Sequence, residues 1–299
     1  MTGTVLNLAW GAATDRGLRR AVNEDSYLAQ HPVFLVADGM GGHEGGAAAS
    51  RTALAAFDAL IGSDRAMVPA VESAVAAASL AVRSLPHNGS APGTTLSGAV
   101  LCTQQGEDYW LILNIGDSRT YRWSGGRLTQ ISIDHSAVQE LVDRGALDPA
   151  DAASHPHGNV VTRAMGAGSS GIPDYWLLPV DDGDRLIVCS DGLTKELHEC
   201  DIAAVVGEES SPQAAATRLL HTALLGGGRD NVTVVIVDAH GGGSDDDDEP
   251  TAPSNRGASA DERGWGFPHP DEADTHPAQG LAGGGPAREG DHDADVFHG

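Results

Sequence analysis

The sequence predicts an α+β protein in which antiparallel sheets carry helices on their outer faces. Short β-branched or aromatic runs bounded by Gly, Asp or Pro indicate strands, and longer Ala- and Leu-rich stretches with helical periodicity indicate helices. Two long helices come together early, a meander of strands follows, and further helices precede a last strand. This order differs from the regular strand–helix alternation of a parallel doubly wound sheet, so we expect antiparallel pairing.

The elements can be assigned in chain order. The predicted strands are Val5–Trp10, Val33–Ala37, Leu96–Leu101, Tyr109–Ile115, Arg119–Trp123, Tyr175–Pro179, Arg185–Cys189 and Val232–Val237. The predicted helices are Gly45–Ile61, Val68–Leu85, Ala137–Arg144, Asp201–Val206 and Pro212–Leu225. Ser211 before Pro212 is typical of a helix start, and the Gly226–Gly228 run is typical of a helix end. The polar, Gly- and His-rich segment Asp148–Gly171 predicts a surface loop or lid.

Composition indicates one folded domain and a tail. The chain has 299 residues and a formal net charge of −24. Residues 1–238 are long enough to bury a sizeable core, whereas residues 239–299 are rich in Gly, Pro, Asp and His with little aliphatic content and are expected to be disordered. The acidic charge is spread over both parts without a basic cluster. This argues against partners such as nucleic acid or an anionic membrane surface.

The compartment follows from three further features. No apolar run reaches the roughly 18 residues that span a bilayer, and the first ten residues lack the basic and apolar regions of a signal peptide. The cysteines are Cys102, Cys189 and Cys200, an odd number without a C-x-x-C pattern, so they are expected to be reduced thiols. We therefore expect a cytoplasmic, monomeric protein that does not bind membranes.

Acidic residues stand at the ends of predicted strands. Asp38, Asp117 and Asp191 follow apolar runs, and Asp230 directly precedes the last one. Crowded carboxylates repel one another and need cations, and oxygen-only ligands suit hard ions such as Mg²⁺, Mn²⁺ or Ca²⁺. Each aspartate alone is better explained as a turn or helix cap, but four together favour a metal site. The Asn23–Asp25 segment would add oxygen ligands.

Three other motifs carry less weight. The stretch from Gly39 resembles a dinucleotide fingerprint, but Glu44 stands where G-x-G-x-x-G requires glycine. Gly116-Asp117-Ser118 resembles the nucleophile block of GDS-type esterases, but it lies mid-chain without the late Asp-x-x-His pair, so Ser118 is expected to be a turn hydroxyl. Five of the 13 histidines lie in the tail at irregular spacing, which indicates solvated low-complexity sequence rather than a transition-metal site.

Eight sequence blocks follow one another over the region from about Thr4 to Asp238. They are Thr14–Tyr27 (TDRGLRRAVNEDSY), Val36–Gly46 (VADGMGGHEGG), Gly93–Leu96 (GTTL), Asn114–Trp123 (NIGDSRTYRW), Asp134–Ser136 (DHS), Thr162–Gly166 (TRAMG), Ser190–Leu193 (SDGL) and Gly227–Val237 (GGRDNVTVVIV). In this order and spacing they resemble the bacterial form of the metal-dependent Ser/Thr protein phosphatases, the type 2C or PPM family. The resemblance implies a four-layer αββα sandwich of two antiparallel sheets flanked by helices.

The resemblance also implies a metal site with two Mn²⁺ or Mg²⁺ ions. Asp38 would bridge the two ions. Asp191 and Asp230 would complete one of them, and the Gly39 carbonyl would ligate the other. Glu24 and Asp25 would act largely through water, and Asp117 with Asp191 would hold a third, weaker metal.

The chemistry implied by the resemblance is hydrolysis of phosphoserine and phosphothreonine by a metal-bridging hydroxide. Arg20 would bind the substrate phosphate in fork geometry. Eukaryotic members often carry a proton-donating histidine directly after the Asp-Gly, but here that position is Met40. His43 would reach the leaving group, water on the metal would supply the proton, or His43 would merely cap a helix; the motif position leaves these alternatives open.

The expected partners are phosphorylated proteins, including the Ser/Thr kinases that such a phosphatase opposes. Selectivity would come from the segment Ala137–Gly171 rather than from a deep pocket. Two alternatives compete with this interpretation: a catalytically silent sensor of the same fold, and a Ca²⁺- or Mg²⁺-binding interaction module. The intact carboxylates count against the first alternative, and Arg20 has no use in the second.

Overall fold

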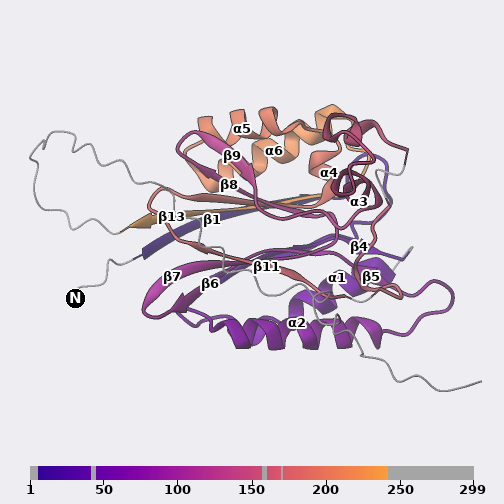
Figure 1. The fold of residues 1–299 in the computed structure, drawn as a ribbon, viewed down its shortest axis with the longest axis horizontal. Helices are drawn as coiled ribbons and strands as arrows, with labels where there is room; N and C mark the ends of the chain where they lie inside the picture. Colours follow the sequence, from indigo (N-terminus) through magenta and orange to yellow (C-terminus); the bar gives the residue numbers. More distant parts are fainter. Residues whose placement is uncertain (1–5, 42–44, 157–159, 170, 242–299) are drawn as a thin grey trace, which may run out of the picture. The chain divides into compact units, whose positions relative to one another are not determined.

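Two five-stranded antiparallel sheets lie face to face in a computed structural model that describes residues 6–41, 45–156, 160–169 and 171–241 (Figure 1). The first sheet has the order β1 (Leu6–Asp15), β13 (Val232–Gly241), β12 (Arg185–Cys189), β8 (Arg119–Ser124) and β9 (Arg127–Gln130). The second has the order β11 (Asp174–Pro179), β7 (Glu107–Ile115), β6 (Leu96–Gln104), β3 (Val33–Ala37) and β2 (Ser26–Gln30). A small third sheet joins β10 (Met165–Gly166), β5 (Gly93–Thr94) and β4 (Gly39–Met40).

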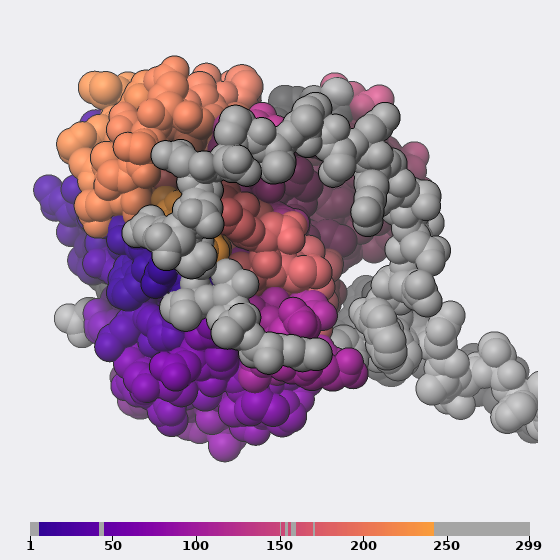
Figure 2. Space-filling model, turned by 90° about the vertical axis from the view of Figure 1, so that its left-hand side faces the viewer, coloured from indigo at the N-terminus to yellow at the C-terminus, as the bar shows by residue number. Residues whose placement is uncertain are grey.

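Helices cover the two outer faces. The pair α1 (Gly45–Ala55) and α2 (Val68–Arg83) packs on the second sheet, and α5 (Glu199–Glu208) and α6 (Pro212–Gly226) pack on the first. The short helices α3 (Ala137–Asp143) and α4 (Asp191–Thr194) lie at the end of the sandwich that also holds β4 and β5 (Figure 1). Viewed from the opposite end, the orange C-terminal layer and the purple N-terminal helical layer lie on opposite sides (Figure 2).

Strand alternation produces three apolar layers. In β3, Leu35 faces α1 and α2, whereas Phe34 and Val36 face the other sheet. In β13, Val234 packs under α5 and α6, whereas Val235 points into the space between the sheets. Successive side chains of a strand point to opposite faces, so a continuous apolar run is what a strand covered on both sides requires. The predicted αββα sandwich is therefore confirmed.

The predicted strands all form within the described residues, which exclude Val5, and two of them, Val33–Ala37 and Arg185–Cys189, match the structure at both ends. The sequence interpretation missed β2 and β9, which lie at the outer edges of their sheets. Their residues are mostly half-buried or exposed, so neither strand carries the continuous apolar run that marks an inner strand.

Among the departures from the prediction, three concern how the chain is laid out. The helix predicted over Gly45–Ile61 ends at Ala55, and a 3₁₀ turn over Asp58–Leu60 follows, because the chain turns there to bury Phe57. The segment Asp148–Gly171 is not only a loop, since it contains a 3₁₀ helix at Pro149–Ser154 and strand β10. The last strand runs to Gly241, three residues beyond the expected domain end, because it pairs with the whole of β1.

Two expectations concern the ends of the chain and the membrane. Residues 242–299, which include most of the predicted tail, lie outside the described residues, so the disorder of the tail stays a prediction. Within the described part of the chain, none of the helices combines the length and the apolar character that crossing a bilayer demands.

We expect Leu186→Ala to destabilise the protein by about 2–5 kcal/mol, because the truncation leaves a cavity between the two sheets, where Leu186 is fully buried. Leu80→Ala is the matched control, since the Leu80 side chain on α2 is 63% exposed and its loss should change the free energy of unfolding by less than about 0.5 kcal/mol. Denaturant unfolding measures both. Equal effects of the two substitutions would contradict this assignment of the core.

Candidate metal centre

The topology brings four strand ends to one end of the sandwich. Strands β3 and β7 are both antiparallel to β6, so their carboxyl ends lie at the same edge, and Asp38 and Asp117 directly follow this edge. In the other sheet β12 and β13 are antiparallel, so Asp191 after β12 lies beside Asp230 before β13. Aspartates far apart in the chain therefore converge from both sheets, close to β4 and α4 (Figure 1).

Asp38 is held by its backbone. Its N–H donates to Thr95 Oγ1 at 2.9 Å, and its carbonyl accepts from Thr94 Oγ1 and from the Thr95 N–H, both at 2.9 Å. The next residue, Gly39, lies so close to the start of α1 that a Cβ there would stand 2.2 Å from the Gly46 carbonyl oxygen. A side chain at this position would clash with α1. Because residue 39 is glycine, the chain can pass between the sheet and α1 directly after Asp38.

The segment before β2 is tied to the opposite sheet. Asp25 is 8% exposed, and its Oδ2 accepts hydrogen bonds from Ser190 Oγ and Thr233 Oγ1, both at 2.8 Å. The backbone N–H of Glu24 donates to Asn231 Oδ1 at 2.9 Å. These bonds place both acids beside the ends of β12 and β13, so that the two sheets contribute to one site.

Burial and mutual repulsion raise the pKa values of these carboxyls. Burial, followed by the charges of Asp25, Asp191 and Asp117, raises the pKa of Asp38 well above its usual value. Burial raises the pKa of Asp25 to about 7 against the opposing hydrogen bonds of Ser190 and Thr233. Burial together with the charge of Asp191 raises the pKa of Asp117 to about 7. Such a cluster holds negative charge only at a cost, so positive charge at the site stabilises it.

Two cationic side chains contact the cluster. The Lys195 ammonium pairs with Asp191 Oδ2 and lies 3.0 Å from Asp230 Oδ2. An Nη2 of Arg20 lies 2.8 Å from Asp230 Oδ1. Burial acts to raise the pKa of Asp230, but the charges of Lys195 and Arg20 hold it below its usual value. Asp230 therefore loses its proton more readily than the carboxyl groups around it.

The donor set suits hard divalent cations. Asp25 Oδ1 and Asp191 Oδ1 are buried and receive no hydrogen bond from the described residues, a costly situation that a bound cation relieves. As the side chains are oriented here, however, no three His, Cys, Asp or Glu groups of the described chain form a ready-made metal site. Asp191 and Asp230 are turned toward Lys195 instead, so cation binding requires local side-chain rearrangement.

The comparison with known families agrees with this geometry. The family model of protein phosphatase 2C matches residues 18–224, the region that carries most of the acids and cations just described. The chain belongs to the protein phosphatase 2C family. The Ser/Thr protein phosphatase PstP of Mycobacterium tuberculosis is 37% identical over 201 residues, which cover 65% of this chain and 38% of that protein. The chain thus spans about two fifths of that relative.

Two further comparisons cover their counterparts more fully. The Ser/Thr phosphatase stp of Listeria welshimeri is 32% identical over 214 residues, which cover 66% of this chain and 82% of that protein. A crystal structure of the catalytic domain of PstP in complex with two manganese ions superposes with a TM-score of 0.70 at 34% identity, covering 79% of this chain and all of that one. Both similarities extend over most of the folded part of this chain.

The other residues singled out from this phosphatase 2C sequence are placed as follows. Ser118 is fully buried and shares a 2.7 Å hydrogen bond with Thr95 Oγ1, which excludes the exposed nucleophile of an esterase. His43 lies outside the described residues, so its role in proton transfer stays a prediction. Arg20 reaches the cluster with a half-exposed side chain, and its role in phosphate binding stays a prediction.

Sequence reasoning missed Lys195, Asn231 and His135. Lys195 follows Asp191 by four residues, which is the spacing at which side chains meet on one face of a helix, and this signal could have found it. Asn231 links Glu24 to the backbone carbonyls of Arg16 and Val22, more than 200 residues away in sequence, so no local pattern marks it. The Nδ1 of His135 accepts from the Gly116 N–H, next to Asp117, at 3.1 Å.

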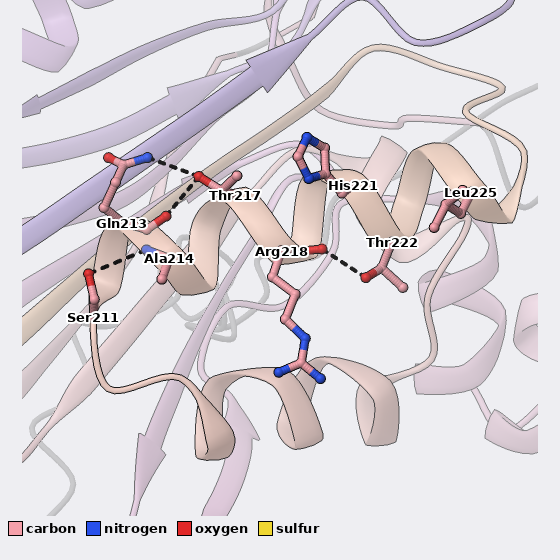
Figure 3. A pocket seen from close by; sticks show the side chains of 8 residues that line it. All are labelled: Ser211, Gln213, Ala214, Thr217, Arg218, His221, Thr222 and Leu225. Carbon is pink, nitrogen blue, oxygen red and sulfur yellow. Dashed lines mark hydrogen bonds between the residues drawn. The ribbon is translucent and has the colours of Figure 1, made fainter.

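A shallow hollow elsewhere on the surface does not belong to the site. It runs along the outer face of α6 (Figure 3). The hydroxyls of Thr217 and Thr222 in it donate to carbonyls one turn earlier, and Arg218 pairs with Glu208 and Glu209. These three polar side chains are thus satisfied within the helical layer. The full lining is Ser211, Gln213, Ala214, Thr217, Arg218, His221, Thr222 and Leu225.

The raised pKa values of Asp25 and Asp117 predict a pH-dependent stability in EDTA. A carboxyl whose pKa is raised by folding binds its proton more tightly in the folded state, so its contribution to stability is lost as the pH rises toward about 7. Between about pH 5 and 7 the free energy of unfolding should fall, by at most about 1.4 kcal/mol per pH unit for each such carboxyl. Denaturant unfolding across this range measures the slope.

The control for this pH dependence is Asp25→Asn. The asparagine side chain keeps an acceptor for Ser190 and Thr233 but does not titrate, so the slope should become shallower. A variant with the slope of the wild type would mean that Asp25 does not carry the effect. The lowered pKa values of Asp174 and Glu196 act below this range and with the opposite sign.

Proposed function

We propose that this protein is a metal-dependent phosphatase that hydrolyses phosphoserine and phosphothreonine in proteins. The observation that carries the proposal is the convergence of buried carboxylates from both sheets with one half-exposed arginine at their edge. Membership of the protein phosphatase 2C family and the Ser/Thr phosphatase names of the relatives support it.

The proposed cofactor is Mn²⁺ or Mg²⁺, with two ions per chain. Asp38 would contact both ions, Asp191 and Asp230 one of them, and the Gly39 carbonyl the other. Glu24 and Asp25 would act through water, and Asp117 with Asp191 would hold a third ion. The buried oxygens of Asp25 and Asp191 that receive no hydrogen bond from the described residues support this assignment, as do the two manganese ions of the related PstP domain.

Several residues of the chain would have separate roles in phosphate hydrolysis. When bound, such ions supply an activated water for in-line attack on phosphorus. Arg20 would grip two phosphate oxygens in fork geometry and neutralise part of the charge that develops in the transition state. Thr94 and Thr95 keep Asp38 in place through its backbone, so that little reorganisation is needed during the reaction. Either His43 or a water molecule would donate a proton to the leaving oxygen.

The proposed partners are phosphorylated proteins, among them the Ser/Thr kinases that the enzyme would oppose. Selectivity would come from the segment Ala137–Gly171. The hydrogen bond from the Gly116 N–H to His135 Nδ1 places the residue two positions before this segment beside Asp117. We further propose that the protein acts as a cytoplasmic monomer in signalling and that its acidic tail is a disordered extension of the catalytic domain.

The central test is hydrolysis of a phosphothreonine peptide with Mn²⁺, with EDTA, and by Asp38→Asn. We expect turnover only for the wild type with Mn²⁺, and a loss of at least about 10²-fold in kcat/KM for Asp38→Asn, because Asp38 lies among the other carboxylates of the cluster. Circular dichroism of the variant controls for folding. Activity that persists both in EDTA and in Asp38→Asn would contradict the assignment as a metal-dependent phosphatase.

A second test separates Arg20 from the metal ligands. Arg20→Ala should raise KM for the phosphopeptide, and the Ki for inorganic phosphate, about tenfold or more, because a charge-assisted fork is lost. Arg19→Ala is the neighbouring control and should leave both constants unchanged. Calorimetry should still detect Mn²⁺ binding by Arg20→Ala; its loss would mean that Arg20 supports the metal site rather than the substrate.

A further inference from the structure

Lys195 is exceptional in this chain. Of the 18 Lys and Arg residues in the sequence, only Lys195 is a lysine. It lies one turn after Asp191, directly at the end of α4, and its side chain is 30% exposed. The other basic side chain at the cluster, Arg20, is 50% exposed and pairs with Asp230, whereas the Lys195 ammonium contacts both Asp191 and Asp230.

The Lys195 ammonium lies where a metal ion is expected. Its two partners are the carboxylates proposed to complete one metal ion, and Oδ2 of Asp191 and Oδ2 of Asp230 both face this one positive charge. A lysine ammonium is compact and sits on a flexible four-carbon stem, so it can fill such a position and also leave it. In this arrangement no three acids of the described chain are set up to hold a metal ion.

Ammonium and divalent cation exclude one another here. The ammonium pairs with Oδ2 of Asp191 and Oδ2 of Asp230, the two carboxylates proposed to hold one metal ion, and two positive charges at the same carboxylates repel. The partly exposed side chain has solvent into which it can swing, while Asp191 Oδ1, buried and without a donor among the described residues, stays available for the incoming ion. Metal binding therefore requires that Lys195 break its contacts with Asp191 and Asp230.

We propose that Lys195 is a built-in counter-ion of the carboxylate cluster that competes with divalent cations for Asp191 and Asp230. Lys195 stabilises the fold without metal and lowers the affinity of the site for metal. The protein therefore binds metal only when the free metal concentration is high enough to displace Lys195. This inference rests on the proposed metal centre but not on catalysis.

The first experiment measures metal binding rather than activity. Calorimetric titration of the full chain with Mn²⁺ should give a Kd at least about tenfold lower for Lys195→Met than for the wild type, because a charge-assisted contact no longer has to be broken. In EDTA the same variant should unfold at a lower denaturant concentration than the wild type. Lys195→Arg retains the charge and should keep the affinity of the wild type within about threefold.

The matched control is Arg218→Met, which removes one positive charge from ion pairs on α6, away from the cluster. It should leave the Kd for Mn²⁺ unchanged. An affinity of Lys195→Met equal to or weaker than that of the wild type, or no Mn²⁺ binding by either protein, would overturn the counter-ion role. Tighter Mn²⁺ binding by Lys195→Met in a protein that hydrolyses no phosphopeptide would support it and reject only the proposed function.

The second experiment observes the displacement directly. Because Lys195 is the single lysine, protein grown with ¹³C-labelled lysine gives one set of side-chain signals in an NMR spectrum. Titration with diamagnetic Mg²⁺ should shift and narrow the Cε signal as the side chain is released into solvent. The same titration of Asp191→Asn should produce little change. A Cε signal that stays broad and unshifted while calorimetry shows saturation with Mg²⁺ would contradict the proposal.

Discussion

The repulsion among carboxylates buried at one end of a β-sandwich is the constraint on which the rest of this structure depends. Asp25, Asp38, Asp117 and Asp191 are buried close to one another. Burial and the neighbouring negative charges raise their pKa values. A fold does not keep such a cluster without a compensating use for it or a compensating charge. Side-chain cations supply part of that charge, and the donor set indicates divalent ions for the remainder.

The frame around the cluster explains how it can persist. Hydroxyl groups of Thr94 and Thr95 fix the backbone of Asp38, and those of Ser190 and Thr233 bind one oxygen of Asp25. The bonds to Asp25 cross between the two sheets at the end where the acids lie. The three apolar layers hold the two sheets together. The free energy gained by packing this core offsets the electrostatic free energy of keeping like charges near one another.

The inner strands and most helices were predictable because their patterns are local. Strands buried on both faces carry uninterrupted apolar runs, and Arg185–Cys189 is buried from end to end. Edge strands such as Ser26–Gln30 and Arg127–Gln130 face solvent and lack that signal, so they were missed. The early end of the first helix depends on the burial of Phe57, which is a tertiary contact.

For the site, the sequence alone determined which acids stand at strand ends, that Gly39 follows the first of them, and that Arg20 belongs to the same family motif. The tertiary structure alone decided their partners. Asp25 meets Thr233 across 208 positions of the chain, and Lys195 turns toward Asp230 rather than solvent. The physical reason is that spacing within a segment follows from local backbone geometry, whereas contacts between strand ends depend on how two sheets pack.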